Sequence, residues 1–222
     1  MKIIARIQTD FKEKFGIPRQ SGLLRGAIGR IVFEKEYRID ASLYGIEGYS
    51  HLWLIWNFSE VERDTWSPTV RPPRLGGNKR MGVFATRSPF RPNPIGLSSV
   101  RLLEVRKTEN EGTVLIVEGA DMLDGTPIYD IKPYLAFTDA HPDAIGGFAD
   151  HVKENTLKVH ITDEQIAFLG DSADTVIQML EGDPHPHYKT DPEREYGMIY
   201  GCFDVKFKIN GDTLTVTKIS KI

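Results

Sequence analysis

The sequence RMGVFATRSPFRPNPIGLSSVRLL, residues 80–103, contains two apolar segments joined by a proline-rich loop. Three prolines fix φ and bias the residues before them toward extended conformations: Pro89, Pro92 and Pro94. We therefore expect a stiff loop between two strands that presents Arg87 and Arg91 as preorganised guanidinium groups, which suit a carboxylate, a phosphate or a planar base. Gly96 lets the chain turn into the second strand. A proline-braced turn with no binding role is the alternative.

Alternating apolar and polar residues predict further strands on both sides of this loop. The strands expected in the first part of the chain cover residues 2–9, 24–34, 51–58, 81–86, 97–107, 113–121 and 126–137. A short helix is expected over residues 38–45, and a long, proline-containing loop over residues 61–79. Asp124 and Gly125 predict a hairpin-type turn.

The last third of the chain has a different pattern. The capping sequence TDEQ at residues 162–165 begins a predicted helix whose apolar face continues to Leu180, although Gly170 weakens it. An Asn-Gly pair joins two predicted strands, residues 198–209 and 213–219, in a hairpin. The pattern therefore changes from strands alone to a mixture of helix and strands.

These elements predict a mostly β protein with two domains. We expect a β-rich domain over residues 1–148 and a small α+β domain, a helix plus a β-hairpin, over residues 149–222. Cys202 is the only cysteine, which excludes an intramolecular disulfide and favours a reducing, cytoplasmic environment. The N-terminus does not resemble a signal peptide, and no apolar run is long enough to span a membrane.

Charge is distributed unevenly along the chain, whose net charge is −3. Residues 63–103 hold eight basic side chains and one acidic one, whereas residues 139–204 hold fourteen acidic and four basic ones. A strongly basic segment in a mildly acidic protein favours a polyanionic partner or an anionic substrate group. Solvation of an exposed loop is the alternative explanation.

Several common functional motifs are missing. The sequence has no glycine-rich dinucleotide or phosphate loop, no H-E-x-x-H zinc motif and no G-x-S-x-G nucleophile elbow. His185 and His187 are too few for a metal site, so we expect no bound metal. General chemistry alone therefore indicates a β-rich protein with a rigid basic loop.

The loop and five other segments together resemble the TsaA-like family, also called TrmO, in its long bacterial form. These segments are GIPRQ (residues 16–20), GIEGYSHLWLIWNF (45–58), DGTPIYDIKPY (124–134), DPHPHY (183–188) and EYGMIYGCFDV (195–205). The sequence departs from the family at His185 and His187, where the family usually has Arg and Ala. This departure concerns the contribution of the second domain and leaves the cofactor site unaffected.

The resemblance implies a fold, a reaction and a set of partners. It implies a small single-sheeted β-barrel, S-adenosyl-L-methionine as the methyl donor, and a homodimer. The implied substrate is tRNA, methylated on N6 of N6-threonylcarbamoyladenosine at position 37, next to the anticodon.

The resemblance also implies which residues hold the cofactor. Carried over by position, the contacts fall on Pro18, Arg19, Gln20, His51, Leu52, Arg87, Leu97, Asp124, Gly125, Thr126 and Pro127. Without the resemblance, His51 would be interpreted as a partly buried histidine with its hydrogen bonds satisfied. Residues 124–127 would be interpreted as a simple turn.

Methyl transfer to this nitrogen requires loss of a proton, and therefore a general base. Asp130 and Tyr134 are the candidates, because they follow the DGTP segment. The candidate substrate contacts are arginines of the basic segment: Arg71, Arg74, Arg80 and Arg91. Two alternatives remain: a non-catalytic nucleotide- or RNA-binding module, and a methyltransferase that acts on another small substrate. The acidic second domain keeps the latter open, because it is a poor surface for tRNA.

Overall fold

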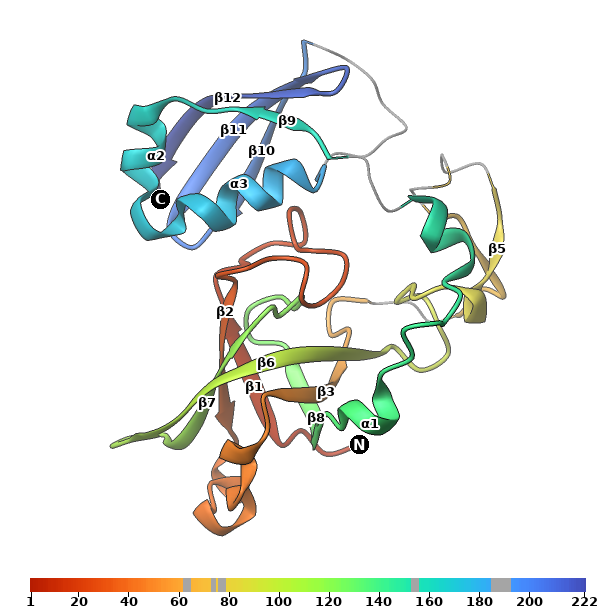
Figure 1. Cartoon of the computed structure of the whole chain (residues 1–222), viewed down its shortest axis with the longest axis vertical. Coiled ribbons are helices and arrows are strands. Elements are labelled where there is room, and N and C mark those ends of the chain that lie inside the picture. Colours follow the sequence, from red (N-terminus) through yellow and green to blue (C-terminus); the bar gives the residue numbers. More distant parts are fainter. Residues whose placement is uncertain (62–64, 73–74, 76–78, 153–155, 185–192) are drawn as a thin grey trace.

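The computed structural model describes the whole chain except residues 62–64, 73–74, 76–78, 153–155 and 185–192. The described residues form two units (Figure 1): a closed β-barrel, and a four-stranded sheet with helices on one face. The predicted mostly β fold with an N-terminal barrel is confirmed. The predicted domain boundary after residue 148 stays a prediction.

The barrel is a closed, antiparallel sheet of six strands. In order around the barrel they are β1 (Ala5–Thr9), β2 (Ile28–Phe33), β7 (Gly112–Glu118), β6 (Ile95–Thr108), β3 (His51–Asn57) and β8 (Pro127–Pro133). Alternation places Leu52, Leu54 and Trp56 of β3 in the barrel interior, where at most 5% of each is exposed. Closure pairs β1 with β8, so the sheet has no free edge strand.

The second unit is a mixed sheet whose core is covered by two helices. Its strands, in order, are β10 (Glu195–Tyr200), β11 (Phe203–Asn210), β12 (Thr213–Lys221) and β9 (Lys158–His160), the last parallel to β12. The helices are α2 (Asp163–Leu169) and α3 (Ala173–Glu181). The predicted cap is confirmed, because Thr162 and Gln165 form a reciprocal capping box at the start of α2.

Four predicted elements of the barrel unit need correction. The helix expected over residues 38–45 is only the 3-10 turn Asp40–Leu43. The strand expected over residues 81–86 is only Met81–Gly82 (β5), which pairs with Thr69–Val70 (β4) inside the expected long loop; a 3-10 turn follows. The strand expected over residues 126–137 ends at Pro133 and is followed by α1 (Ala136–Asp139). The turn at Asp124 and Gly125 joins β7 to β8, which are not neighbours in the barrel, so it is no hairpin.

Glycines explain the corrections in the second unit. Gly170, at φ +55°, separates α2 from α3, so the single predicted helix is two. Gly201, at φ +58°, turns the chain between β10 and β11, and residues 198–209 are therefore two antiparallel strands. Across the described parts of both units, 3-10 turns lie at Lys35–Tyr37, Asp40–Leu43, Ile46–Gly48, Val83–Ala85, Gly147–Val152 and Gly170–Ser172.

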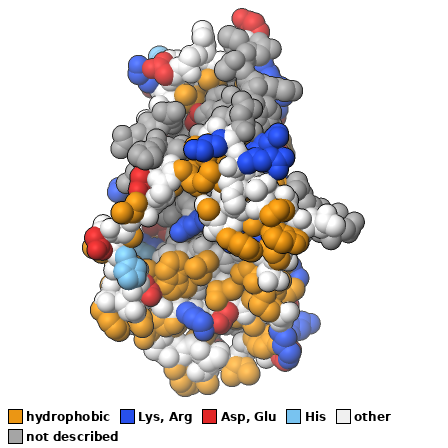
Figure 2. Space-filling view, turned by 90° about the vertical axis from the view of Figure 1, so that its right-hand side faces the viewer, with side chains coloured by type: hydrophobic (Ala, Val, Ile, Leu, Met, Phe, Trp, Pro, Cys, Tyr) orange, Lys and Arg blue, Asp and Glu red, His pale blue; other side chains and the backbone are white. Residues whose placement is uncertain are grey.

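One face of the barrel unit carries many exposed apolar side chains. The side of the molecule with β5 and α1 faces the viewer in Figure 2, where hydrophobic side chains gather between lysines and arginines. Phe84 and Phe137 are among the exposed large hydrophobic residues of the chain, at 71% and 89% exposure. Exposed apolar groups of this kind are typical of surfaces that contact another molecule.

Candidate functional site

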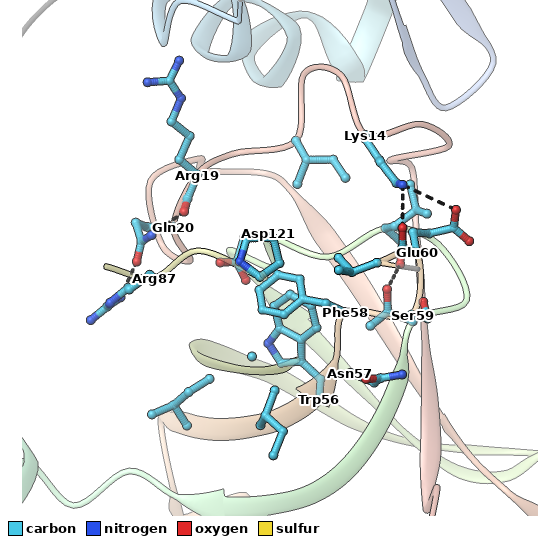
Figure 3. Close-up of a pocket in the computed structure, with 18 of the residues that line it drawn as sticks. Lys14, Arg19, Gln20, Trp56, Asn57, Phe58, Ser59, Glu60, Arg87 and Asp121 are labelled. Atoms are coloured by element: carbon cyan, nitrogen blue, oxygen red, sulfur yellow. Dashed lines mark hydrogen bonds and ion pairs between the residues drawn. The ribbon is translucent and has the colours of Figure 1, made fainter. Parts of the chain in front are cut away.

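A cavity of about 790 Å³ lies at one end of the barrel (Figure 3), within the size range of small-molecule sites. At this end β1, β3 and β7 finish and β2, β6 and β8 begin, so their connecting segments meet there. The segments are residues 10–27, 58–94 and 119–126. They carry three of the sequence motifs, GIPRQ, the arginine-proline loop and the start of DGTP.

Seven of the predicted contact residues line this cavity. They are Pro18, Arg19, Gln20, Arg87, Arg91, Leu97 and Thr126. The lining also includes aromatic rings from β3, from the residue after it and from the proline loop: Trp53, Trp56, Phe58 and Phe90. Cationic groups and flat rings therefore share one space, which suits a ligand with both an anionic group and a planar ring.

His51 and Tyr134 do not line the cavity, but both lie near one residue that does. His51 begins β3 two residues before Trp53, which lines the cavity, and the Tyr134 ring lies 5.5 Å from the Trp53 ring between centroids. Tyr134 follows the end of β8 and lies beside His51, with ring centroids 6.1 Å apart. Leu52 is fully buried in the barrel core. No observation tests the predicted roles of these residues.

The remaining residues of the DGTP segment form the turn that leads into β8. Asp124 accepts a hydrogen bond from the Thr9 backbone N–H at 3.0 Å and pairs with Lys12 at 2.9 Å. Gly125 has a φ of +76°, and Pro127 is the buried first residue of β8. Their predicted cofactor contacts stay predictions, since these three residues do not line the cavity.

Asp130, Arg71 and Arg80 are also outside the cavity lining, whereas Arg91 is part of it. Asp130 lies on β8 and pairs with Lys132 at 2.9 Å. Arg80 donates to the Thr69 hydroxyl at 2.9 Å, close to where Arg71 follows β4. Arg74 lies outside the described residues. Their proposed roles are untested.

Hydrogen bonds within the proline loop add to the stiffness expected from its three prolines. Arg91 Nη1 donates to the Thr86 carbonyl at 3.0 Å and to the Ser88 carbonyl at 3.4 Å. Its guanidinium also lies 5.8 Å from the centre of the Phe84 ring. Arg91 therefore braces the loop while lining the cavity. Arg87, by contrast, is exposed and donates to the Gln20 side-chain oxygen.

Gly96 is required by the ring that lies against it. Gly96 is the partner of Trp56 in the β3–β6 pairing, and a Cβ added to it would lie 2.2 Å from the indole. Only glycine allows the ring this close to the backbone. Phe58, which also lines the cavity, packs against Trp56 with ring centroids 4.3 Å apart. The glycine of the motif PIGLSS thereby fixes one wall of the cavity.

Asp121 is a functional candidate that the sequence analysis missed. Trp56 Nε1 donates to Ser98 Oγ at 2.9 Å, and Ser98 Oγ donates to Asp121 Oδ1 at 2.6 Å. Asp121 lines the cavity, and its burial raises the pKa of its carboxyl above the usual value, although the Ser98 bond and the positive charge of Arg87 oppose the shift. The arrangement presents a fixed, poorly solvated carboxylate, as expected of a proton acceptor.

A signal for Asp121 is present in the sequence. It is the acid that ends the apolar segment VLIVEGAD, so it follows a buried strand. That position identifies a strand-end carboxylate, but only the fold shows that this strand end opens into the cavity.

Within the described residues, no group of three or more His, Cys, Asp or Glu side chains is arranged to hold a metal ion. No helix among them is long and apolar enough to cross a membrane.

The fold and the cavity define a β-barrel protein with a cavity whose size and lining suit a small ligand with charged and planar parts. The chain belongs to the tRNA-methyltransferase O family. The family model for the N-terminal domain matches residues 6–140, and the model for the TrmO C-terminal domain matches residues 154–222. The family predicted from the sequence motifs is confirmed.

Relatives cover nearly the whole chain. The tRNA (adenine(37)-N6)-methyltransferase of Escherichia coli K12 is 40% identical over 215 residues, which span 93% of this chain and 91% of that protein. A Pseudomonas aeruginosa relative whose name includes S-adenosylmethionine-dependent methyltransferase is 39% identical over 212 residues, 91% of this chain and 89% of that protein. A crystal structure of TrmO from Pseudomonas aeruginosa has a TM-score of 0.74 and 31% identity, covering 98% of this chain and 97% of that one.

Proposed function

We propose that the chain is an S-adenosyl-L-methionine-dependent tRNA methyltransferase that methylates N6 of N6-threonylcarbamoyladenosine at position 37. The observation that carries the proposal is the cavity in which Arg87, Asp121 and Trp56 meet, in a chain of this family. The named activity of the Escherichia coli relative supports the reaction and the position in tRNA. The threonylcarbamoyl group of the substrate is the part that follows from the sequence resemblance alone.

The lining residues fit S-adenosyl-L-methionine. The cofactor combines a planar adenine with a carboxylate, an ammonium group and a sulfonium. Flat rings of Trp53, Trp56 and Phe58 offer stacking surfaces for a base. Arg87 is a bidentate donor that suits the carboxylate. Asp121 supplies the negative charge that a cationic ligand favours.

The reaction depends on positioning and on removal of one proton. When bound, the cofactor would supply an electrophilic methyl group, and the chain would hold the N6 nitrogen of the substrate in position to accept it. We propose that the ionised carboxylate of Asp121 accepts the N6 proton. Ser98 donates to Oδ1, and the backbone of Ser21 also hydrogen-bonds the carboxyl group, so the carboxylate is held in place. The electron pair of the broken bond stays on sulfur, and the N6–H pair forms the new N–CH3 bond.

The basic segment supplies the proposed tRNA surface. Arg71, Arg80 and Arg91 come from a part of the chain with a local excess of positive charge. Lys and Arg contacts to phosphates release counterions, so tRNA binding is expected to weaken as salt increases. Of these three arginines, Arg91 is the one that lines the cavity, so we propose it as the substrate contact nearest the reacting base.

We also propose a homodimer and a cytoplasmic location. The exposed apolar side chains over the β5 and α1 face, seen in Figure 2, support an interface between two copies. A tRNA substrate supports the cytoplasm, and the single cysteine agrees with a reducing environment.

Calorimetric titration with S-adenosyl-L-methionine and S-adenosylhomocysteine tests the cofactor assignment. We expect saturable binding of both ligands at one site per chain and quenching of tryptophan fluorescence, because Trp53 and Trp56 line the cavity. Absence of heat and of a thermal shift at millimolar ligand would contradict the assignment. Binding that leaves the fluorescence unchanged would place the ligand away from this cavity.

A further inference from the structure

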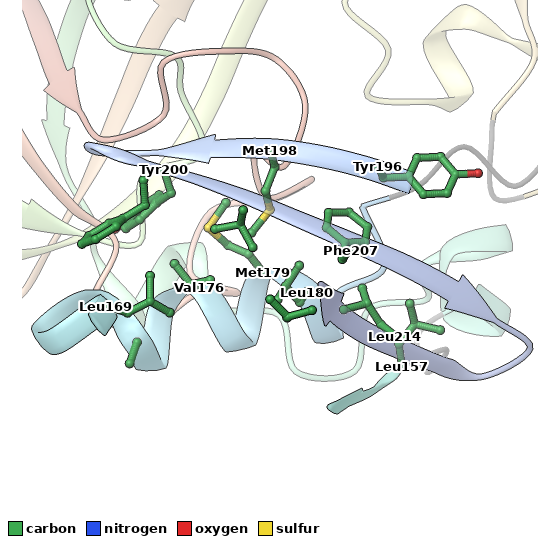
Figure 4. Packing of buried hydrophobic residues seen from close by; sticks show 14 of the residues in the cluster. Leu157, Leu169, Val176, Met179, Leu180, Tyr196, Met198, Tyr200, Phe207 and Leu214 are labelled. Carbon is green, nitrogen blue, oxygen red and sulfur yellow. The ribbon is translucent and has the colours of Figure 1, made fainter. Parts of the chain in front are cut away.

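The segment between β1 and β2, which carries GIPRQ, is built into the core of the second unit (Figure 4). Three of its residues are buried members of that core: Phe11, Leu24 and Ala27. The Phe11 ring contacts Tyr200 edge-on at 5.5 Å between centroids, and Phe15 stacks near Phe207 at 6.5 Å. The segment therefore connects two strands of the barrel, but its apolar side chains pack in the core of the second unit.

Hydrogen bonds join the same segment to the strands and helices of the second unit. The Gly201 N–H donates to the Asp10 carbonyl at 2.8 Å, and the Ile199 N–H donates to Glu13 Oε1 at 2.9 Å. At the other end of the segment, the Arg25 N–H donates to the side chain of Gln178 at 3.0 Å. Both ends are thus held by the second unit.

The middle of the segment, which includes cavity-lining residues, also contacts the second unit. Gly16 has a φ of +87°, and a Cβ there would lie 3.2 Å from Met179 Cε and 3.3 Å from Met198 Sδ. Arg19 donates through Nη2 to the Asp183 carbonyl at 3.1 Å, and its side chain points toward the second unit in Figure 3. Asp183 is 4% exposed and itself has a positive φ of 57°.

The next residue completes a path to the cofactor cavity. Gln20 follows Arg19 and accepts a hydrogen bond from Arg87 of the proline loop, which lies beside it in Figure 3. Pro18, Arg19 and Gln20 all line the cavity. Contacts with the second unit therefore set the position of one cavity wall and, through Gln20, the position of Arg87.

We propose that the second unit positions the cofactor cavity: Met179, Met198 and the Asp183 carbonyl hold the GIPRQ segment in the conformation that binds the methyl donor. This inference rests on the proposed function, since it takes the cavity as the cofactor site. It gives the second unit a role in cofactor affinity although Met179, Met198 and Asp183 do not line the cavity.

Two glycines of this segment provide a matched test in the full chain. Gly16→Ala and Gly22→Ala both place alanine at a positive φ, +87° and +75°, so both carry backbone strain. Only Gly16→Ala meets side chains of the second unit; at Gly22 nothing lies within 4 Å. We expect Gly16→Ala to weaken S-adenosylhomocysteine binding about tenfold by calorimetry. Gly22→Ala is expected to bind like the wild type.

A second variant keeps the test decisive if Gly16→Ala does not fold. Glu13→Ala removes the side chain that accepts from the Ile199 N–H and adds no backbone strain, and Glu13 does not line the cavity. We expect a several-fold loss of S-adenosylhomocysteine affinity and faster amide exchange over residues 17–21. Glu34→Ala, which removes an exposed partner of Arg6, is the control and should change neither.

The outcomes separate this inference from the proposed function. If the wild type does not bind S-adenosylhomocysteine, or if Arg87→Ala binds it normally, the cofactor assignment fails. If the wild type binds and Arg87→Ala weakens binding, while Gly16→Ala and Glu13→Ala match the wild type, the positioning role is wrong. Equal losses for Gly16→Ala and Gly22→Ala would also overturn it, because strain in the segment would then explain both.

Discussion

Asp121→Asn is expected to lower kcat for tRNA methylation by about 100-fold or more, the usual contribution of a general base. Asparagine keeps an oxygen that accepts the Ser98 hydroxyl but has no carboxylate to accept the N6 proton. Binding of S-adenosylhomocysteine should change much less than kcat. Single-turnover methylation and calorimetry on the same preparation measure the two quantities.

The pH dependence gives an independent check of this role. Because burial raises the pKa of Asp121, its carboxylate is lost at a higher pH than that of an exposed aspartate. Wild-type kcat should therefore fall on the acid side above the usual aspartate range, and this limb should be absent in Asp121→Asn. Asp130→Asn is the control, since Asp130 pairs with Lys132 away from the cavity lining. A large kcat loss only in Asp130→Asn would make Asp130 the base.

Arg87→Ala is expected to weaken S-adenosyl-L-methionine binding by about one to two orders of magnitude, the usual cost of a lost charged hydrogen bond, roughly 1.5–3 kcal/mol. Arg87 is exposed, faces the cavity and has the Gln20 oxygen as a partner, so its loss removes a donor from the proposed cofactor site. Arg91→Ala should leave cofactor affinity nearly unchanged and lower turnover on tRNA. Calorimetry and methylation assays measure the two effects.

The contacts of Arg91 require one control in this comparison. Arg91 also donates to the carbonyls of Thr86 and Ser88, so its removal loosens the loop. Circular dichroism and thermal melting must show that both variants are folded. Arg→Lys should not fully rescue either position, because an ammonium cannot make a planar bidentate contact. Equal loss of cofactor binding and turnover in both variants would contradict the separate roles proposed for Arg87 in cofactor binding and Arg91 in tRNA turnover.

Local patterns predict the barrel well, because alternation along a half-buried strand is a property of each strand by itself. Residues 51–58 are an example: β3 has the expected inward residues Leu52, Leu54 and Trp56. The same reasoning joined β10 and β11 into one strand, since a glycine turn such as Gly201 barely interrupts the apolar pattern. Strand existence was thus predictable, and strand ends less so.

The site depends on strand direction and pairing, which local patterns do not encode. His51 and Asn57 belong to one predicted strand, but only the structure shows that Asn57 lines the cavity and His51 does not. Asp121 was missed for the same reason. The packing of the GIPRQ segment on Met179 and Met198 joins residues more than 150 positions apart, which no local pattern predicts.

The most direct test of the central claim is nucleoside mass spectrometry after incubation of the purified chain with S-adenosyl-L-methionine carrying a labelled methyl group. Two preparations of the same tRNA serve as substrates, one with the threonylcarbamoyl group on the adenosine at position 37 and one without it. We predict a mass increase of one labelled methyl on N6-threonylcarbamoyladenosine, and none in the unmodified tRNA. Equal labelling of both tRNAs, or labelling of neither by a chain that binds the cofactor, would contradict the proposed function.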